Sequence, residues 1–179
     1  MSLPHALITA LIEHPCSGSE LASRFDRSIG YFWHATHQQI YRELGRLEKA
    51  GWIASLPQEK GRGRKRAYRV LPAGRRELKR WASEQQDPKP MRDELMVRIR
   101  AEAAMGSTNI RREIERRLDL HRAKLGHYEM LEARDFPAQH SSRENDLRHL
   151  ILTAGIMLET SWIEFCELTL KTLAKPRDD

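Results

Sequence analysis

The chain has 179 residues and a net charge of +6, and no apolar run approaches the roughly 20 residues that cross a membrane. Its start lacks the charged-then-apolar pattern of an export signal, so we expect a cytoplasmic protein with no membrane partner. Residues 1–90 hold 16 lysines and arginines against 9 acidic residues, a balance of +7, whereas residues 91–179 hold 15 against 16, a balance of −1. The first half is therefore expected to meet a polyanion, and the second half is not.

The chain begins with a pattern typical of two short helices. Residues 3–14 are apolar on most sides, which predicts a helix in the core of its domain. A turn follows, and Ser19 is the expected N-cap of a second helix over residues 20–26. The aromatic segment 29–33 is expected to pack these helices against the next one, because core packing is the commoner role of such side chains.

Residues 36–51 predict a recognition helix. Thr36 is the expected N-cap, and Gly51 ends the helix. Ile40, Leu44 and Leu47 share one apolar face, which leaves the opposite face to polar side chains.

A basic hairpin is expected after this helix. A short apolar run begins at Trp52, the glycine-arginine turn 61–66 follows, and the segment 67–70 alternates as a half-buried strand does. Helix, strand, basic turn and strand are the layout of a winged helix-turn-helix, whose recognition helix enters the major groove while the wing lies over the DNA backbone. Most charge runs are solvated surface, but the position of this one and the glycines between its arginines favour DNA contact.

The DNA-binding residues expected from this layout belong to two groups. Glutamine can bond bidentately to adenine, so the first turn of the helix is a candidate for base readout. The candidates are His37, Gln38, Gln39, Tyr41 and Arg42 for the major groove and its edges, and Arg62, Arg64, Lys65 and Arg66 for the backbone or minor groove.

Two prolines in the segment 85–90 interrupt helical continuity after a helix expected from Pro72 to Trp81. We therefore expect a winged helix-turn-helix DNA-binding domain over residues 1–87 and a helical dimerisation domain over residues 91–179. The fold class is mostly α with a small β wing.

The second domain is expected to form three helices, over residues 91–105, 110–136 and 145–173, with good capping residues in the break at 106–109. The last helix has two apolar stripes, and a domain of this size cannot easily bury both. We therefore expect a homodimer with a coiled-coil-like interface. The expected dimerisation residues are Leu150, Ala154, Met157, Leu158 and Phe165.

Catalytic and metal chemistry find no support in the sequence. Cys16 and Cys166 match no metal or redox spacing and are expected to be buried thiols. The eight histidines form no zinc-binding motif, and His121 is expected to be a packed or pH-sensing side chain. We expect no enzyme, no metal and no cofactor.

The segments SLPHALITAL at 2–11 and SIGYFWHATHQQIYRELGRLEKAGW at 28–52 resemble the PadR family of bacterial transcriptional regulators, with weaker support from residues 64–78 and 91–94. The resemblance implies an N-terminal winged helix, a C-terminal helical domain that pairs two chains antiparallel, and Tyr41 at the DNA face against a phosphate. One departure is Leu71-Pro72, where family members often have a capping threonine. Proline at the first helical position partly substitutes for that cap.

The function expected from these observations is sequence-specific regulation of transcription by a homodimer on a pseudo-palindromic operator in double-stranded DNA. One alternative is a ligand-responsive repressor, because many family members respond to small aromatic molecules and Tyr31, Trp33 and Trp81 could line a pocket for one. Another is a helical interaction module whose basic half binds an acidic protein instead of DNA.

Overall fold

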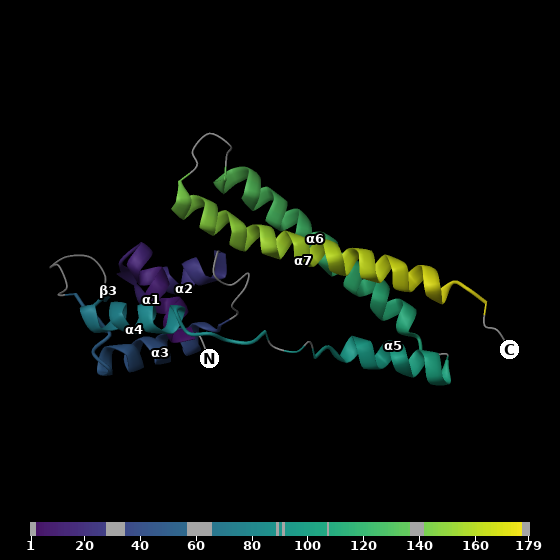
Figure 1. The fold of residues 1–179 in the computed structure, drawn as a ribbon, viewed down its shortest axis with the longest axis horizontal. Coiled ribbons are helices and arrows are strands. Elements are labelled where there is room, and N and C mark those ends of the chain that lie inside the picture. Colours follow the sequence, from purple (N-terminus) through teal and green to yellow (C-terminus); the bar gives the residue numbers. More distant parts are fainter. Residues whose placement is uncertain are drawn as a thin grey trace. The chain divides into compact units, whose positions relative to one another are not determined.

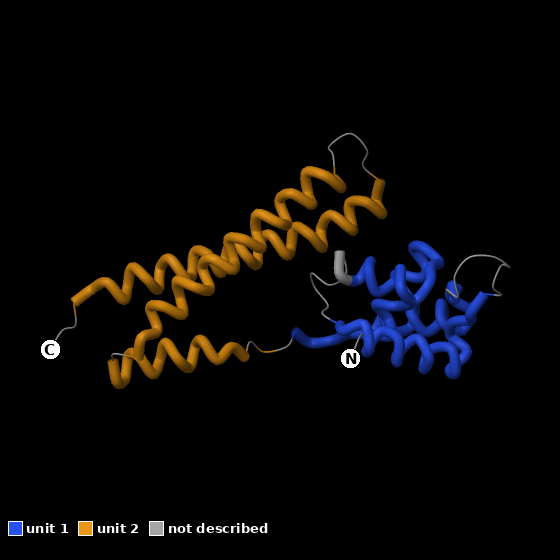
Figure 2. Tube along the Cα trace, turned by 180° about the vertical axis from the view of Figure 1, so that it is seen from behind, with its two compact units in different colours: residues 1–88 blue, residues 89–179 orange. Residues whose placement is uncertain are grey.

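The computed structural model describes residues 3–27, 35–56, 66–88, 90, 92–106, 108–136 and 142–176. The chain divides into two compact units, Met1–Pro88 and Lys89–Asp179 (Figure 2). The fold is mostly helical with a small three-stranded antiparallel sheet, which confirms the predicted fold class (Figure 1). None of the helices in the described ranges is long and apolar enough to cross a bilayer.

The first unit contains four helices and three short strands among its described residues. The strand order is β1-β3-β2, with β3 in the centre, antiparallel to both neighbours. In chain order the elements are α1 (Leu3–Glu13), β1 (Cys16–Ser17), α2 (Gly18–Arg27), α3 (His37–Lys49), β2 (Ile53–Ser55), β3 (Ala67–Val70) and α4 (Pro72–Ala82).

Helix α1 is the centre of this unit, as its apolar sequence predicts. It packs against α2, α3, α4 and β3 and buries residues on most of its circumference. The opposing helices contribute Phe25 from α2 and Ile40, Leu44 and Leu47 from α3, all of them almost fully buried. The apolar stripe of α3 therefore faces the core, and the burial of this stripe sets the orientation of the helix.

The cap of α2 differs from the prediction. Ser17 caps the helix, because its hydroxyl accepts a hydrogen bond from the Glu20 amide at 3.3 Å and its own amide donates to the Glu20 carboxylate at 2.9 Å. These reciprocal bonds form a capping box. The prediction of Ser19 was wrong because Cys16 and Ser17 pair with β3 as a strand, which moves the helix start to Gly18.

Helix α4 begins as the sequence predicts, with Leu71 at the N-cap, no side-chain cap and Pro72 in the first turn. Gly74 brings this helix close to the sheet. A Cβ at Gly74 would lie 2.4 Å from the carbonyl oxygen of Trp52, so no larger residue fits without a backbone shift.

The second unit consists of α5 (Glu94–Met105), α6 (Ile110–Asp135) and α7 (Arg143–Leu173) in its described part. Helices α6 and α7 lie side by side as a long hairpin, and α5 packs on the first part of α6 (Figure 1). The break before α6 is where the sequence predicts it. Asn109, however, adopts a left-handed conformation with φ 58° and makes no side-chain cap bond, so it is not the capping residue its type suggests.

Buried polar contacts fix the register of the α6–α7 hairpin. Glu159 on α7 is 2% exposed, and its carboxylate lies 2.6 Å from Nδ1 of His121 and 2.7 Å from Nζ of Lys124, both on α6. Burial opposes the charge of Lys124, but the hydrogen bond to Glu159 raises the pKa of this amine above its ordinary value. A buried carboxylate needs such partners, so sliding one helix along the other would leave a charge unpaired.

Candidate nucleic-acid interface

Helix α3 begins with a complete capping box. The backbone amide of Gln39 donates a hydrogen bond to Oγ1 of Thr36 at 3.2 Å, and the side-chain oxygen of Gln39 accepts one from the backbone amide of Thr36 at 2.8 Å. This confirms Thr36 as the N-cap. It also restricts Gln39, because a bidentate contact to adenine needs both the oxygen and the nitrogen of the carboxamide. While Gln39 caps the helix, its carboxamide oxygen is held against the backbone amide of Thr36, which makes this side chain less suited to such a contact.

The outer face of α3 carries the other predicted readers. His37, Gln38, Tyr41 and Arg42 are all exposed, because the buried stripe of the same helix faces the core. Arg42 has no ion-pair partner within the described ranges, whereas Arg46, one turn later, lies 3.5 Å from the Glu43 carboxylate. Arg42 is therefore better placed than Arg46 to offer its guanidinium to an external anion.

Tyr41 is held in place by the start of α2. A Cβ at Gly18 would lie 2.7 Å from Cε1 of Tyr41, so the aromatic ring packs directly on the glycine backbone. About half of the side chain stays exposed, at 49%. Gly18 was not predicted as a site residue, because its contact with α3 is not visible in sequence spacing.

The wing is described only at its base. Arg62, Arg64 and Lys65 lie outside the described residues, and their predicted DNA contacts stay predictions. Arg66 is exposed at the base, directly before β3. The β2–β3 pairing extends one residue beyond the end of β2, since the Leu56 amide donates to the carbonyl of Ala67 in β3 at 2.8 Å.

Most of the predicted dimerisation residues lie on an exposed apolar stripe of α7, here called the α7 stripe. Leu150, Met157 and Leu158 are 60%, 65% and 55% exposed, and Ala154 between them is exposed as well. Phe165 differs, because it is half-buried and packs against the unit's own core of α5, α6 and α7. The α7 stripe consists of Leu147, Leu150, Ile151, Ala154, Met157, Leu158 and Leu168.

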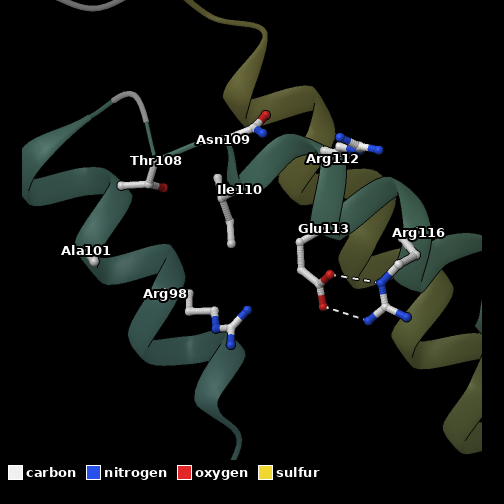
Figure 3. A pocket seen from close by; sticks show the side chains of 8 residues that line it. All are labelled: Arg98, Ala101, Thr108, Asn109, Ile110, Arg112, Glu113 and Arg116. Atoms are coloured by element: carbon white, nitrogen blue, oxygen red, sulfur yellow. Dashed lines mark hydrogen bonds and ion pairs between the residues drawn. The ribbon is translucent and has the colours of Figure 1, made fainter.

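A hollow of about 550 Å³ lies between α5 and the start of α6 (Figure 3). Arginines from both helices line it, but two of them already face carboxylates. Arg116 lies 2.9 Å from Glu113 on α6, and Arg98 lies 3.6 Å from Glu94 on α5. Arg112 also lines the hollow, so three arginines stand against one lining glutamate, but the described lining shows no further feature that indicates a particular ligand.

Of the three aromatic residues suggested to line an effector pocket, only Trp81 lies within the described residues. Tyr31 and Trp33 lie outside the described residues. Trp81 stacks on His5 with ring centroids 4.3 Å apart, and the His5 imidazole lies 3.3 Å from the Glu77 carboxylate. Trp81 thus has a packing role within the first unit.

The two cysteines are buried, as predicted. Burial raises the pKa of both thiols, which disfavours the reactive thiolate. The described side chains include no cluster of three or more potential metal ligands.

Family models match both units of the chain. Residues 7–80 match the model of the transcriptional regulator PadR-like family, and residues 91–174 match the model of the virulence activator alpha C-terminal region. A probable transcriptional regulator of Mycobacterium tuberculosis is 37% identical, and the alignment covers 99% of this chain and all of that protein.

Solved structures are similar over nearly the whole length. The virulence activator AphA of Vibrio cholerae is 26% identical with a TM-score of 0.83, over 96% of this chain and 98% of that one. Bacillus subtilis PadR in complex with operator DNA is 25% identical with a TM-score of 0.83 and the same coverage. The same PadR protein has also been solved in complex with p-coumaric acid, with a TM-score of 0.79, 25% identity and coverage of 98% of this chain and the whole of that one.

Proposed function

Because this chain belongs to the PadR-like family of transcriptional regulators, we propose that it acts as a homodimer that reads a pseudo-palindromic operator with helix α3. The observation that carries this proposal is the division of α3 into a fully buried apolar stripe and an exposed polar face. A helix with this division, fixed on a compact core and followed by a basic hairpin, can enter the major groove as a rigid element.

Base readout is assigned to Gln38. Its carboxamide is exposed in the first turn of α3 and, unlike that of Gln39, takes no part in the capping box. It can therefore present both an acceptor and a donor to one adenine. Tyr41 and Arg42, one turn later, are suited to the phosphates at the groove edge, and Arg66 with the wing arginines to the adjacent backbone.

Dimerisation is assigned to the α7 stripe. Exposed apolar patches of this extent on a helix mark interaction sites in soluble proteins. A second copy would cover the stripe with its own, as an isologous interface requires. The dimer would hold two α3 helices at a fixed spacing, and binding two half-sites at once raises affinity without any new contact.

The test uses the full-length protein and genomic DNA fragments. Recovery of bound fragments identifies the operator and its half-site spacing. Affinity is then measured on this operator and on random duplex DNA at low and moderate salt. We expect a two-fold symmetric operator and binding that weakens steeply with salt. A protein that binds no DNA at any salt concentration is instead the helical interaction module, and a monomer at micromolar concentration contradicts the dimer.

A small aromatic effector is the second candidate, because the structurally similar B. subtilis PadR has been solved with p-coumaric acid. The ligand would make this chain a ligand-responsive repressor. Calorimetry against a panel of aromatic acids, followed by DNA binding in their presence, tests this function. Heat of binding together with weaker DNA affinity supports it, and the absence of both contradicts it.

A further inference from the structure

Gly45 stands well inside the thirteen-residue helix α3, where glycine is an unfavourable choice. Glycine disfavours a helix interior more than any residue except proline, because the unfolded chain gains backbone freedom from it. The conformation does not require it either. Among the described glycines, positive φ angles are confined to Gly51 and Gly106.

The described residues give no steric reason for this glycine. A Cβ at Gly45 would meet no heavy atom within 4 Å, apart from its own helix backbone and neighbours. Gly18 and Gly74 differ, because a Cβ there would lie 2.7 Å from the Tyr41 ring and 2.4 Å from the Trp52 carbonyl oxygen. Those two glycines are needed for packing, whereas no described residue packs closely on Gly45, which weakens the helix.

The position of Gly45 suggests where the benefit lies. Gly45 is exposed and follows Gln38 by seven residues, which is about two helical turns, so both lie along nearly the same line of the helix surface. That line is about 10 Å long at 1.5 Å per residue, and it passes between exposed Tyr41 and Arg42.

We propose that residue 45 is glycine because DNA approaches the backbone of α3 at this point too closely to admit a side chain. This inference rests on the proposed function, since it takes the outer face of α3 to be the DNA face. Glycine is the residue that permits close approach of a backbone to a ligand. Gly45 is thus a positioning residue, which sets how deeply the helix lies in the groove.

The experiment substitutes Gly45→Ala and Gly45→Leu in the full-length protein and measures both melting temperature and DNA affinity. The alanine variant should melt roughly 2–8 °C higher, because alanine favours the helix. The same variant should bind DNA about tenfold more weakly, because an added methyl group in a close contact is a steric penalty. The leucine variant should bind more weakly still.

Gly126→Ala is the matched control. Gly126 lies inside α6, and a Cβ added there would also meet no heavy atom within 4 Å, so alanine should raise the melting temperature without changing DNA affinity. The inference is wrong if Gly45→Ala binds DNA as tightly as the parent, or if Gly126→Ala weakens binding equally. A parent protein that binds no DNA is a different outcome, because it overturns the proposed function itself and the inference with it.

Discussion

The two units of this protein differ in how many of their large apolar side chains are exposed. Among the described residues, eleven large hydrophobic side chains are exposed, and ten of them belong to the second unit. The exception in the first unit is Tyr41, which lies on the face assigned to DNA. The first unit therefore buries its apolar side chains in its own core, whereas the second leaves the α7 stripe exposed. Apolar periodicity alone does not distinguish these cases, since both α3 and α7 show it, and the difference lies in how many stripes a helix carries.

The largest expected effect concerns the closed core of the first unit. Leu44 is almost fully buried between α3 and its neighbours, and Leu44→Ala should lower the free energy of unfolding by about 2–5 kcal/mol, through lost burial and a remaining cavity. Urea denaturation measures this. Leu158→Ala on the exposed α7 stripe is the counterpart. At protein concentrations low enough to prevent association, it should change stability by less than about 0.5 kcal/mol, and a loss as large as that of Leu44→Ala would contradict the comparison.

A charge on the α7 stripe should separate the dimer without unfolding the chain. Met157→Glu places a carboxylate where a second copy is expected to pack, and an unpaired buried charge costs several kcal/mol. We expect the dimer dissociation constant to rise by a factor on the order of 100 or more, and operator affinity to fall with it. Sedimentation measures the mass, and circular dichroism checks the helix content. Lys171→Glu, an exposed polar position on the same helix, serves as the control and should stay dimeric.

The elements that the sequence predicts well are those whose signal is local. The α3 helix with its Thr36 cap follows from spacing and capping chemistry, and the structure confirms both. Sequence spacing did not predict the role of residues that depends on a contact with a distant segment of the chain. Ser17 is an N-cap because it pairs with β3, about fifty residues later, and Phe165 is drawn into the core by α5 and α6. Gly18 and Gly45 were missed as well. Yet Gly45 carried a readable signal, since an isolated glycine inside a helical pattern calls for a reason.

Substitutions of Gln38 and of a basic residue of the wing should change DNA binding in different ways, because only Gln38 is assigned to base readout. Gln38→Ala is expected to weaken operator binding by about 1–3 kcal/mol and random-DNA binding very little, with relaxed preference at one base pair per half-site. Arg66→Ala should weaken both kinds of DNA alike and reduce the salt slope by about one unit if a phosphate contact is lost. Fluorescence anisotropy over a salt series measures both variants. Equal losses on both DNAs for Gln38→Ala would mean that α3 does not read sequence.

The capping box of α3 should contribute a smaller amount. Thr36→Ala removes the acceptor for the Gln39 amide and should destabilise the first unit by about 1 kcal/mol, within a range of about 0.5–2. Leu71→Ala at the start of α4 is the matched control, because Leu71 makes no side-chain cap bond, although some loss of packing is expected. Thermal unfolding compares the two. Retention of full stability in Thr36→Ala would show that the observed cap bonds contribute nothing net.

The smallest effect is a pH dependence within the second unit. Hydrogen bonds from Arg116 and then Arg117 lower the pKa of Glu113 from 4.5 to about 2. A carboxylate whose pKa is lower in the folded state stabilises the protein above its ordinary pKa, and this contribution disappears as the pH falls from about 4.5 toward 2. Glu113→Gln should therefore be less stable than the parent at pH 7, and the difference should shrink as the pH falls and be lost only below about pH 2. Urea unfolding of both proteins across this range measures the difference, with Glu129→Gln, an exposed position on the same helix, as the control.

The exposed ion pairs are screened by solvent, so we expect a small change that is largest at low salt. A difference between Glu113→Gln and the parent that stays constant across this pH range would mean that packing, and not the carboxylate charge, is what the substitution removes.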